Sequence, residues 1–168
     1  MDALDRDVLL ALQAQGRMSN LALARSLRLS PSAMLGRVRR LERDGVIRGY
    51  RAVLDPAALG ITVRAFVLAR LREHSERSIL EFEEGIKTVP GVRACYHVTG
   101  QFDMVVELAL RDLDHLSRLI RVDIARIPGV MHLETMLIMA ESVADEGWPV
   151  IPDDAAVAQD PAGPDDRT

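Results

Sequence analysis

Cysteine is almost absent from this sequence, and long hydrophobic runs are missing altogether. The 168 residues contain one cysteine, Cys95, which excludes an internal disulfide and a cysteine-rich metal site. Hydrophobic residues make up 48% of the chain. They fall in short runs that do not reach the roughly 20 residues of a membrane-spanning helix. The acidic start is not followed by an apolar core, so we expect no secretory signal and a cytoplasmic protein.

Motifs for catalysis, metal binding and cofactor binding are also missing. The four histidines lack the spacing of metal ligands, and no glycine-rich phosphate loop or catalytic grouping of serine, cysteine and acids occurs. We interpret His97 and His132 as histidines satisfied within a sheet, and Cys95 as a small buried residue on a strand. The sequence therefore predicts no metal, no cofactor and no enzymatic activity.

Charged residues are distributed unevenly, although the net charge is only −4. Residues 1–55 carry ten arginines and six acids, whereas residues 141–168 carry one base and eight acids. Within residues 28–51, seven arginines against two acids leave a local excess of five positive charges. Such a segment suits the phosphates of a nucleic acid, although a solvated basic face is the alternative.

The first third of the chain predicts three short helices. Each begins at a capping residue and continues with apolar residues at helical spacing. The capping residues are Asp2, Ser19, and Ser30 followed by Pro31. Gly45 ends the third helix, and residues 46–54 have the pattern of a strand. This order predicts a winged helix-turn-helix over residues 1–54, followed by a linker at residues 55–61.

Residues 62–143 contain a weak repeat of strand, helix, Pro-Gly-Val and strand. This order predicts a ferredoxin-like βαββαβ domain, so the expected fold class is α+β with the winged helix-turn-helix in front. The strands are expected at 62–71, from Val92, at 102–110 and from Val130, and the helices at 75–87 and after Asp112. Residues 144–168 are rich in acids and proline, and we expect them to be disordered.

The third and fourth predicted strands are apolar on both sides. Two helices can cover only one face of the sheet, so we expect a second copy of the chain to cover the other face. The pattern leaves open which side of the fourth strand faces outward. Leu137 and Met139 are our first choice, and Ile138 lies on the opposite side.

The third helix has two different sides. Met34, Val38 and Leu41 cluster on one side, which predicts a packed face. Serine and arginine on the other side can bond base edges and phosphates in a major groove. Gly36 costs the helix about 1 kcal/mol relative to alanine, which fits a close approach to DNA but is no proof of it. The predicted DNA-binding residues are Ser30, Ser32, Ala33, Gly36, Arg37, Arg39, Arg40 and Arg43.

From residue 2 to about residue 143, the chain closely resembles the Lrp/AsnC (leucine-responsive and asparagine-regulatory) family of transcription factors. The motifs that carry the resemblance are Leu4-Asp5-Arg6-Asp7, Gly16-Arg17-Met18-Ser19-Asn20, Leu29-Ser30-Pro31-Ser32, Arg37-Val38-Arg39-Arg40-Leu41-Glu42, Asp44-Gly45-Val46-Ile47-Arg48-Gly49-Tyr50, Val98-Thr99-Gly100-Gln101-Phe102-Asp103 and Pro128-Gly129-Val130.

The resemblance implies a regulator that binds double-stranded DNA, forms dimers and higher oligomers, and responds to an amino acid or a related metabolite. The implied effector-binding residues are Thr99, Gly100, Gln101, Asp103 and Thr135. Gly100 permits a turn that exposes backbone donors, and Asp103 can accept a hydrogen bond from an ammonium group. Alternatively, the two are only a hairpin glycine and a turn acid. Gln101 and Met136 depart from the residues common in the family, which leaves the effector open.

Two other functions stay open at this point. Sirohaem decarboxylases resemble the same family and use the same two-domain body, which would make the chain an enzyme. The basic third helix argues against that alternative. The second alternative is an architectural protein that coats DNA without sequence preference and without an effector.

Overall fold

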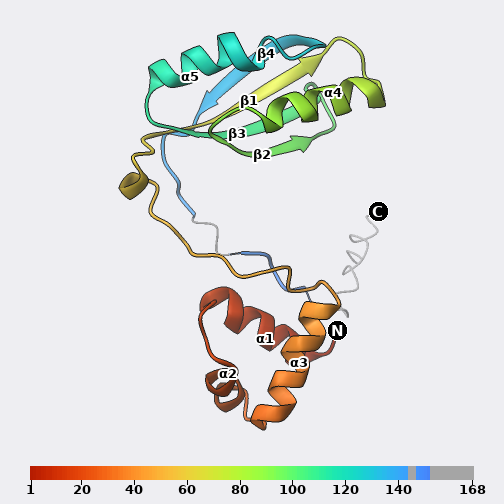
Figure 1. Ribbon diagram of the computed structural model, residues 1–168, viewed down its shortest axis with the longest axis vertical. Coiled ribbons are helices and arrows are strands. Elements are labelled where there is room, and N and C mark those ends of the chain that lie inside the picture. The colour runs from red at the N-terminus through yellow and green to blue at the C-terminus, as the bar shows by residue number, and fades with distance from the viewer. Residues whose placement is uncertain (144–146, 152–168) are drawn as a thin grey trace, which may run out of the picture. The chain divides into compact units, whose positions relative to one another are not determined.

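The computed structural model describes residues 1–143 and 147–151, which divide into two compact units (Figure 1). One unit contains residues Met1–Val53, and the other is Leu54–Val143. The first unit contains α1 (Ala3–Ala14), α2 (Asn20–Ser26) and α3 (Pro31–Arg43). The second contains, in chain order, η1 (Ala57–Leu59), β1 (Val63–Leu71), α4 (Glu76–Lys87), β2 (Val92–His97), β3 (Met104–Leu110), α5 (Leu113–Leu119), the π-helical turn η2 (Ile120–Ile124) and β4 (Val130–Leu137).

The helices of the first unit begin where the sequence predicts. Asp2, Ser19 and Ser30 have extended backbones, and each side chain accepts a hydrogen bond from a backbone N–H in the first turn. These bonds satisfy amide groups that have no partner inside the helix. Gly45 follows α3 with a φ of 72°, a left-handed conformation that favours glycine.

A small apolar core holds the three helices together. Val8 of α1 and Leu23 of α2 are fully buried against Met34, Val38 and Leu41 of α3, which are at most 4% exposed. The predicted packed face of α3 is therefore confirmed. Because this face is fully used inside the unit, only the opposite side of the helix is available to a partner.

The strand predicted for residues 46–54 is wrong. Val53 and Leu54 are 101% and 62% exposed, and the first strand among the described residues is β1. A strand needs a neighbour to pair with its backbone groups, and no described segment of this chain pairs with residues 46–54. The residue pattern expresses side-chain preference, but it cannot supply the pairing partner.

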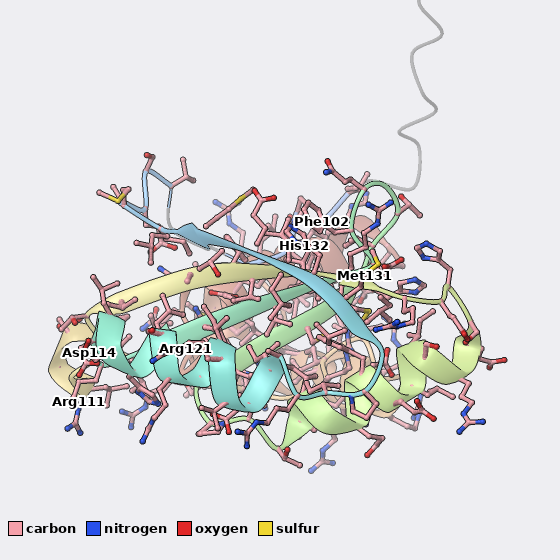
Figure 2. All side chains as sticks on the ribbon, turned by 90° about the horizontal axis from the view of Figure 1, so that it is seen from above. Phe102, Arg111, Asp114, Arg121, Met131 and His132 are labelled. Atoms are coloured by element: carbon pink, nitrogen blue, oxygen red, sulfur yellow. The ribbon has the colours of Figure 1, made fainter. Side chains whose placement is uncertain are left out.

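The second unit is an antiparallel sheet with strand order β2-β3-β1-β4. Both α4 and α5 lie on one face of this sheet (Figures 1 and 2). This is the βαββαβ topology predicted from the repeat. In the described part of the chain, no helix is long and apolar enough to cross a membrane. The prediction of a disordered tail falls mainly on residues 144–146 and 152–168, outside the described residues.

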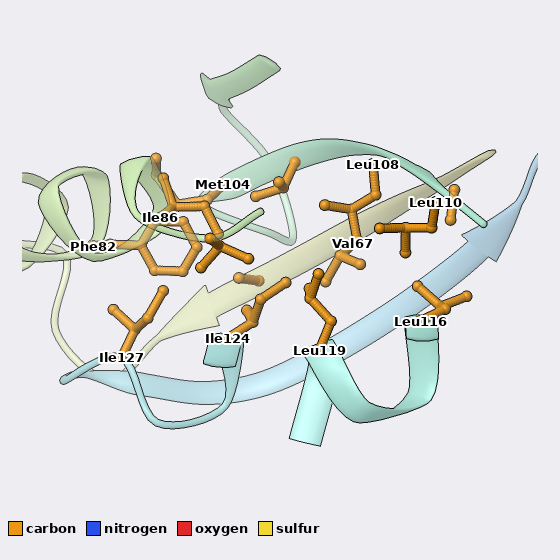
Figure 3. Close-up of a cluster of buried hydrophobic side chains, with 14 of the residues drawn as sticks. Val67, Phe82, Ile86, Met104, Leu108, Leu110, Leu116, Leu119, Ile124 and Ile127 are labelled. Atoms are coloured by element: carbon orange, nitrogen blue, oxygen red, sulfur yellow. The ribbon is translucent and has the colours of Figure 1, made fainter. Parts of the chain in front are cut away.

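The core of the second unit fills the space between the helices and the sheet (Figure 3). Phe82 of α4 and Leu119 of α5 are at most 1% exposed and belong to the same cluster as Val67 of β1. Along β3, buried residues alternate with half-buried ones, as period-two side-chain alternation requires. This packing gives the second unit a core of its own.

The strand register shows which side of β4 is open. Ala65 is fully buried on the helix side and pairs with Leu137, so Leu137 also lies on the helix side. The next pair, Phe66 with Met136, therefore faces away from the helices. Our first choice of Leu137 for the open side is wrong. Because both sides of β4 are apolar, the residue pattern alone could not reveal the register.

The open face of the sheet carries a mixture of apolar residues and ion pairs. Its apolar members on β1, β3 and β4 include Phe66, Leu68, Val105 and Met136, of which Met136 is 47% exposed. Arg64 donates to Glu107 at 3.2 Å and also pairs with Glu141 at 3.1 Å. No helix of the second unit covers this face.

Candidate nucleic-acid interface and effector loop

The first turn of α3 presents small polar residues to solvent. The Ser30 hydroxyl accepts from the Ala33 N–H at 3.3 Å and lies 3.3 Å from the Ser32 hydroxyl. Ser30 thus starts the helix, while Ser32 and Ala33 are exposed on its outer side. A Cβ added to Gly36 would meet nothing within 4 Å, so packing inside the unit does not require glycine here. The outer side is therefore open to a close approach.

Two of the predicted DNA-binding arginines are engaged by carboxylates of α1 and its N-cap. Arg40 Nη2 donates to Asp5 Oδ1 at 2.5 Å, and Arg37 Nη1 donates to Asp2 Oδ2 at 2.6 Å. Arg37 also bonds Asp5, whose side chain is only 3% exposed. The two acids cap α1 reciprocally, with each side chain accepting from the other's backbone N–H. We call these four residues the aspartate-arginine cluster.

The electrostatics of the cluster favour ionised carboxylates. Burial raises the pKa of Asp5, but hydrogen bonds from Arg37 and from the Asp2 N–H outweigh burial and hold that pKa below its ordinary value. The hydrogen bond from Arg37 likewise lowers the pKa of Asp2. Both acids are therefore charged at neutral pH, and they fix the directions of the Arg37 and Arg40 side chains.

The remaining arginines of α3 are freer to meet a partner. Arg43 is 74% exposed and donates to the neighbouring Asp44 at 3.2 Å. Arg39 is exposed and has no ion-pair partner among residues 1–143 and 147–151. Ala33, Gly36, Arg37 and Arg40 line a shallow hollow of about 190 Å³. All eight predicted DNA-binding residues thus belong to α3 or its cap, and they differ in how strongly their side chains are already held.

The predicted effector loop joins β2 to β3. Gly100 has a φ of 124°, and a Cβ placed there would meet nothing within 4 Å. Thr99 and Gln101 are exposed on either side of it. The Val98 N–H donates to the Asp103 carbonyl at 2.9 Å, which closes the base of the loop. Gly100 is therefore required for the backbone turn, and the space around it is open.

Asp103 is occupied within the fold. It is 8% exposed, and its Oδ2 accepts from the Leu71 N–H at 2.7 Å at the end of β1. Its other oxygen bonds Nδ1 of His74. Its own N–H donates to the Ala69 carbonyl at 3.0 Å. This geometry favours a turn acid that holds the loop against β1 over a carboxylate waiting for an ammonium group.

Thr135 is not brought to the loop within one copy of the chain. It pairs with Val67, whereas the loop is bonded to Ala69 and Leu71 farther along β1. The β4 residue beside the loop is His132, whose ring stacks on Phe102 with 6.4 Å between the ring centroids (Figure 2). The sequence reasoning missed His132 as a neighbour of the loop, because only the register of β4 against β1 reveals it.

Comparison with known proteins places these features in context. Family models match the chain as a winged helix-turn-helix DNA-binding domain at residues 1–48 and an Lrp/AsnC ligand binding domain at residues 64–148. The leucine-responsive regulatory protein of Escherichia coli K12 is 34% identical over 141 residues, which cover 84% of this chain and 86% of that protein.

Solved structures agree with this match over most of the chain. A transcriptional regulator of Neisseria meningitidis, determined in complex with L-methionine, has a TM-score of 0.81 and 26% identity over 86% of this chain and 93% of its own. An AsnC-family regulator of Agrobacterium tumefaciens has a TM-score of 0.82 and 28% identity over 89% of this chain and 97% of its own.

Proposed function

Because this chain belongs to the Lrp/AsnC family of DNA-binding transcriptional regulators, we propose that it recognises a specific operator and responds to an amino acid. The observation that carries the proposal is α3, whose apolar side is buried while its basic side is exposed. The matched relatives are regulators, so they support neither a sirohaem-decarboxylase-like enzyme nor an architectural protein. We place the regulator in the cytoplasm.

In this proposal, α3 enters the major groove of double-stranded DNA. Ser32, Ala33 and Gly36 approach base edges, because they are small and exposed in the first turns. Arg39 and Arg43 supply contacts to guanine or phosphate. Arg37 and Arg40 approach DNA in directions set by Asp2 and Asp5, so part of their charge is already neutralised before DNA binds.

The proposed effector is an amino acid held at the loop Thr99-Gly100-Gln101. The relatives that support this are a leucine-responsive protein and a regulator bound to L-methionine. Asp103 contributes by holding the loop against β1, since its carboxylate is already bonded. Because Thr135 lies away from the loop of its own chain, it contributes only if it comes from a second copy.

We further propose a homodimer formed through the open face of the sheet, with dimers joining into higher oligomers. The apolar residues Phe66, Leu68 and Met136 on that face support the proposal, because neither helix packed on the sheet in the unit Leu54–Val143 covers them. A symmetric dimer presents two α3 helices to paired half-sites, which raises specificity above that of one helix.

Selection of duplexes from a random-sequence library with the full chain tests sequence recognition. The affinity for the selected duplex is then compared with that for a shuffled duplex by fluorescence anisotropy at fixed salt. We expect the selected duplex to bind about a thousandfold more tightly or better. Equal affinity for both duplexes would contradict the proposal and favour an architectural protein.

A further inference from the structure

A second hollow lies in the unit Leu54–Val143, away from the effector loop. It has a volume of about 620 Å³, which is within the range of small-molecule sites. Three segments form it: the linker before β1, the end of β3 and the first turns of α5. Its lining includes Leu59, Ile61, Arg111, Asp112, Asp114 and Arg118.

Hydrogen bonds hold the walls of this hollow in place. The Thr62 N–H donates to the Leu110 carbonyl at 3.0 Å, and the Thr62 hydroxyl bonds the Arg111 carbonyl. These bonds fix the end of the linker beside β3. The Asp112 carboxylate accepts from the His115 N–H at 2.6 Å and so is committed to starting α5. The site is therefore formed before any ligand arrives.

The lining carries positive and negative side chains that form no ion pairs with one another. Arg111 and Arg118 are exposed, and neither has an ion-pair partner in the described part of the chain. Asp114 is likewise unpaired there and lies at the same end of the unit as Arg111 (Figure 2). Two arginines and two aspartates give the lining no net formal charge.

The linker side of the hollow is apolar. Leu59 is 60% exposed, and Ile61 is half-buried beside it. A ligand matched to this lining has a carboxylate for the guanidinium groups, an ammonium group for Asp114 and an apolar body. A strongly anionic ligand fits less well, because Asp112 and Asp114 repel it.

We propose that this hollow is a second site for a free amino acid with an apolar side chain. Arg111 and Arg118 bind the carboxylate, Asp114 binds the ammonium group, and Leu59 and Ile61 contact the side chain. The site is separate from the loop at Gly100 and does not depend on it. Because Leu59 belongs to the segment that joins the two units, an occupant holds that segment against α5.

Isothermal titration of the full chain with L-leucine and L-methionine tests the second site. Arg118→Gln is the disabling variant and Arg118→Lys the conservative one. Arg121→Gln is the matched control, because Arg121 lies about one turn after Arg118, in η2, and does not line the hollow. Gly100→Val disables the loop, and circular dichroism confirms that each variant is folded. We expect at least one of these amino acids to bind the Gly100→Val variant, and Arg118→Gln to weaken that binding about tenfold or more.

The outcomes separate the two sites. Binding that Arg118→Gln removes in the Gly100→Val background, and Arg121→Gln does not, supports the hollow whether or not the loop binds an effector. Loss of all binding in folded Gly100→Val, or binding indifferent to Arg118→Gln, overturns the second site and leaves the loop proposal untouched. The ammonium contact is tested separately. Asp114→Asn must weaken the binding of L-leucine but not the binding of its 2-keto acid, which has no ammonium group. Equal effects on the two ligands overturn that contact.

Discussion

Arg40 of α3 donates a hydrogen bond from Nη2 to Oδ1 of Asp5 in α1, at 2.5 Å. The acid is nearly buried, while 43% of the arginine side chain is exposed. One end of the interaction is therefore structural and the other faces the proposed DNA surface. Through Asp5, the direction of a DNA-facing cation depends on how α1 packs against α3.

Asp5→Asn should lower the stability of the helical unit by about 1–3 kcal/mol, because an amide cannot replace a charged acceptor for two guanidinium groups. Hydrogen exchange of the amides in α1 and α3 measures this locally in the full chain. Asp7→Asn is the control, since Asp7 is an exposed acid of the same helix. Equal protection in both variants would show that the aspartate-arginine cluster contributes no stability.

Lowering the pH should reduce the stability of the helical unit. The folded pKa of Asp5 lies below its ordinary value of 3.8, so its contribution is complete above that pH. The contribution is lost as the pH falls from 3.8 through the folded pKa, because the unfolded chain takes up the proton first. Urea unfolding of the wild type and of Asp5→Asn at several acid pH values tests this. The stability difference between them should shrink with falling pH, and a constant difference would contradict the assignment.

Arg43→Ala should reduce the salt dependence of DNA binding by about one unit of slope if it meets one phosphate. Arg40→Ala should do the same and also destabilise the free protein, because it removes a partner of Asp5. Anisotropy titrations over a range of salt concentrations, with thermal melts of the free variants, separate the two effects. An unchanged slope in both variants would show that neither residue contacts a phosphate.

Ser32→Ala should change the preference among operators rather than the salt slope, because Ser32 lies on the outer side of the first turn of α3. Competition between single-base variants of the selected duplex measures that preference. Ser26→Ala is a suitable control, since the Ser26 hydroxyl is bonded to the Leu23 carbonyl within α2. Identical preference profiles for Ser32→Ala and the wild type would exclude Ser32 from base recognition.

Met136→Asp should dissociate the oligomer, whereas Leu137→Asp should leave its mass unchanged. The two residues are neighbours with nearly equal exposure, 47% and 46%, but they lie on opposite sides of β4. An aspartate at position 136 places a charge on the open face, where the second copy is proposed to bind. An aspartate at position 137 places it on the helix side of the edge strand β4, away from that surface. Light scattering of the full chain at micromolar concentration gives the mass. An unmutated chain with the mass of a monomer would contradict the dimer.

Much of the fold could be predicted because the relevant signals are local. Capping residues such as Ser19 and Ser30 mark helix starts by bonding their own first turn, and Pro-Gly-Val marks the two returns to the sheet. The register of β4, the missing strand at residues 46–54 and the bonds of Asp103 depend on partners distant in sequence. Asp5 belongs to a motif that carries the family resemblance. Its pairing with Arg40, however, depends on how α1 packs against α3, which the sequence does not state.

The most direct measurement is the affinity of the full chain for its selected duplex, with and without each common L-amino acid. We predict that at least one amino acid changes this affinity by about five- to 150-fold. In folded Gly100→Val the response should disappear while the affinity without amino acid stays within a few fold. A wild-type affinity that no amino acid changes would contradict an amino-acid-responsive regulator.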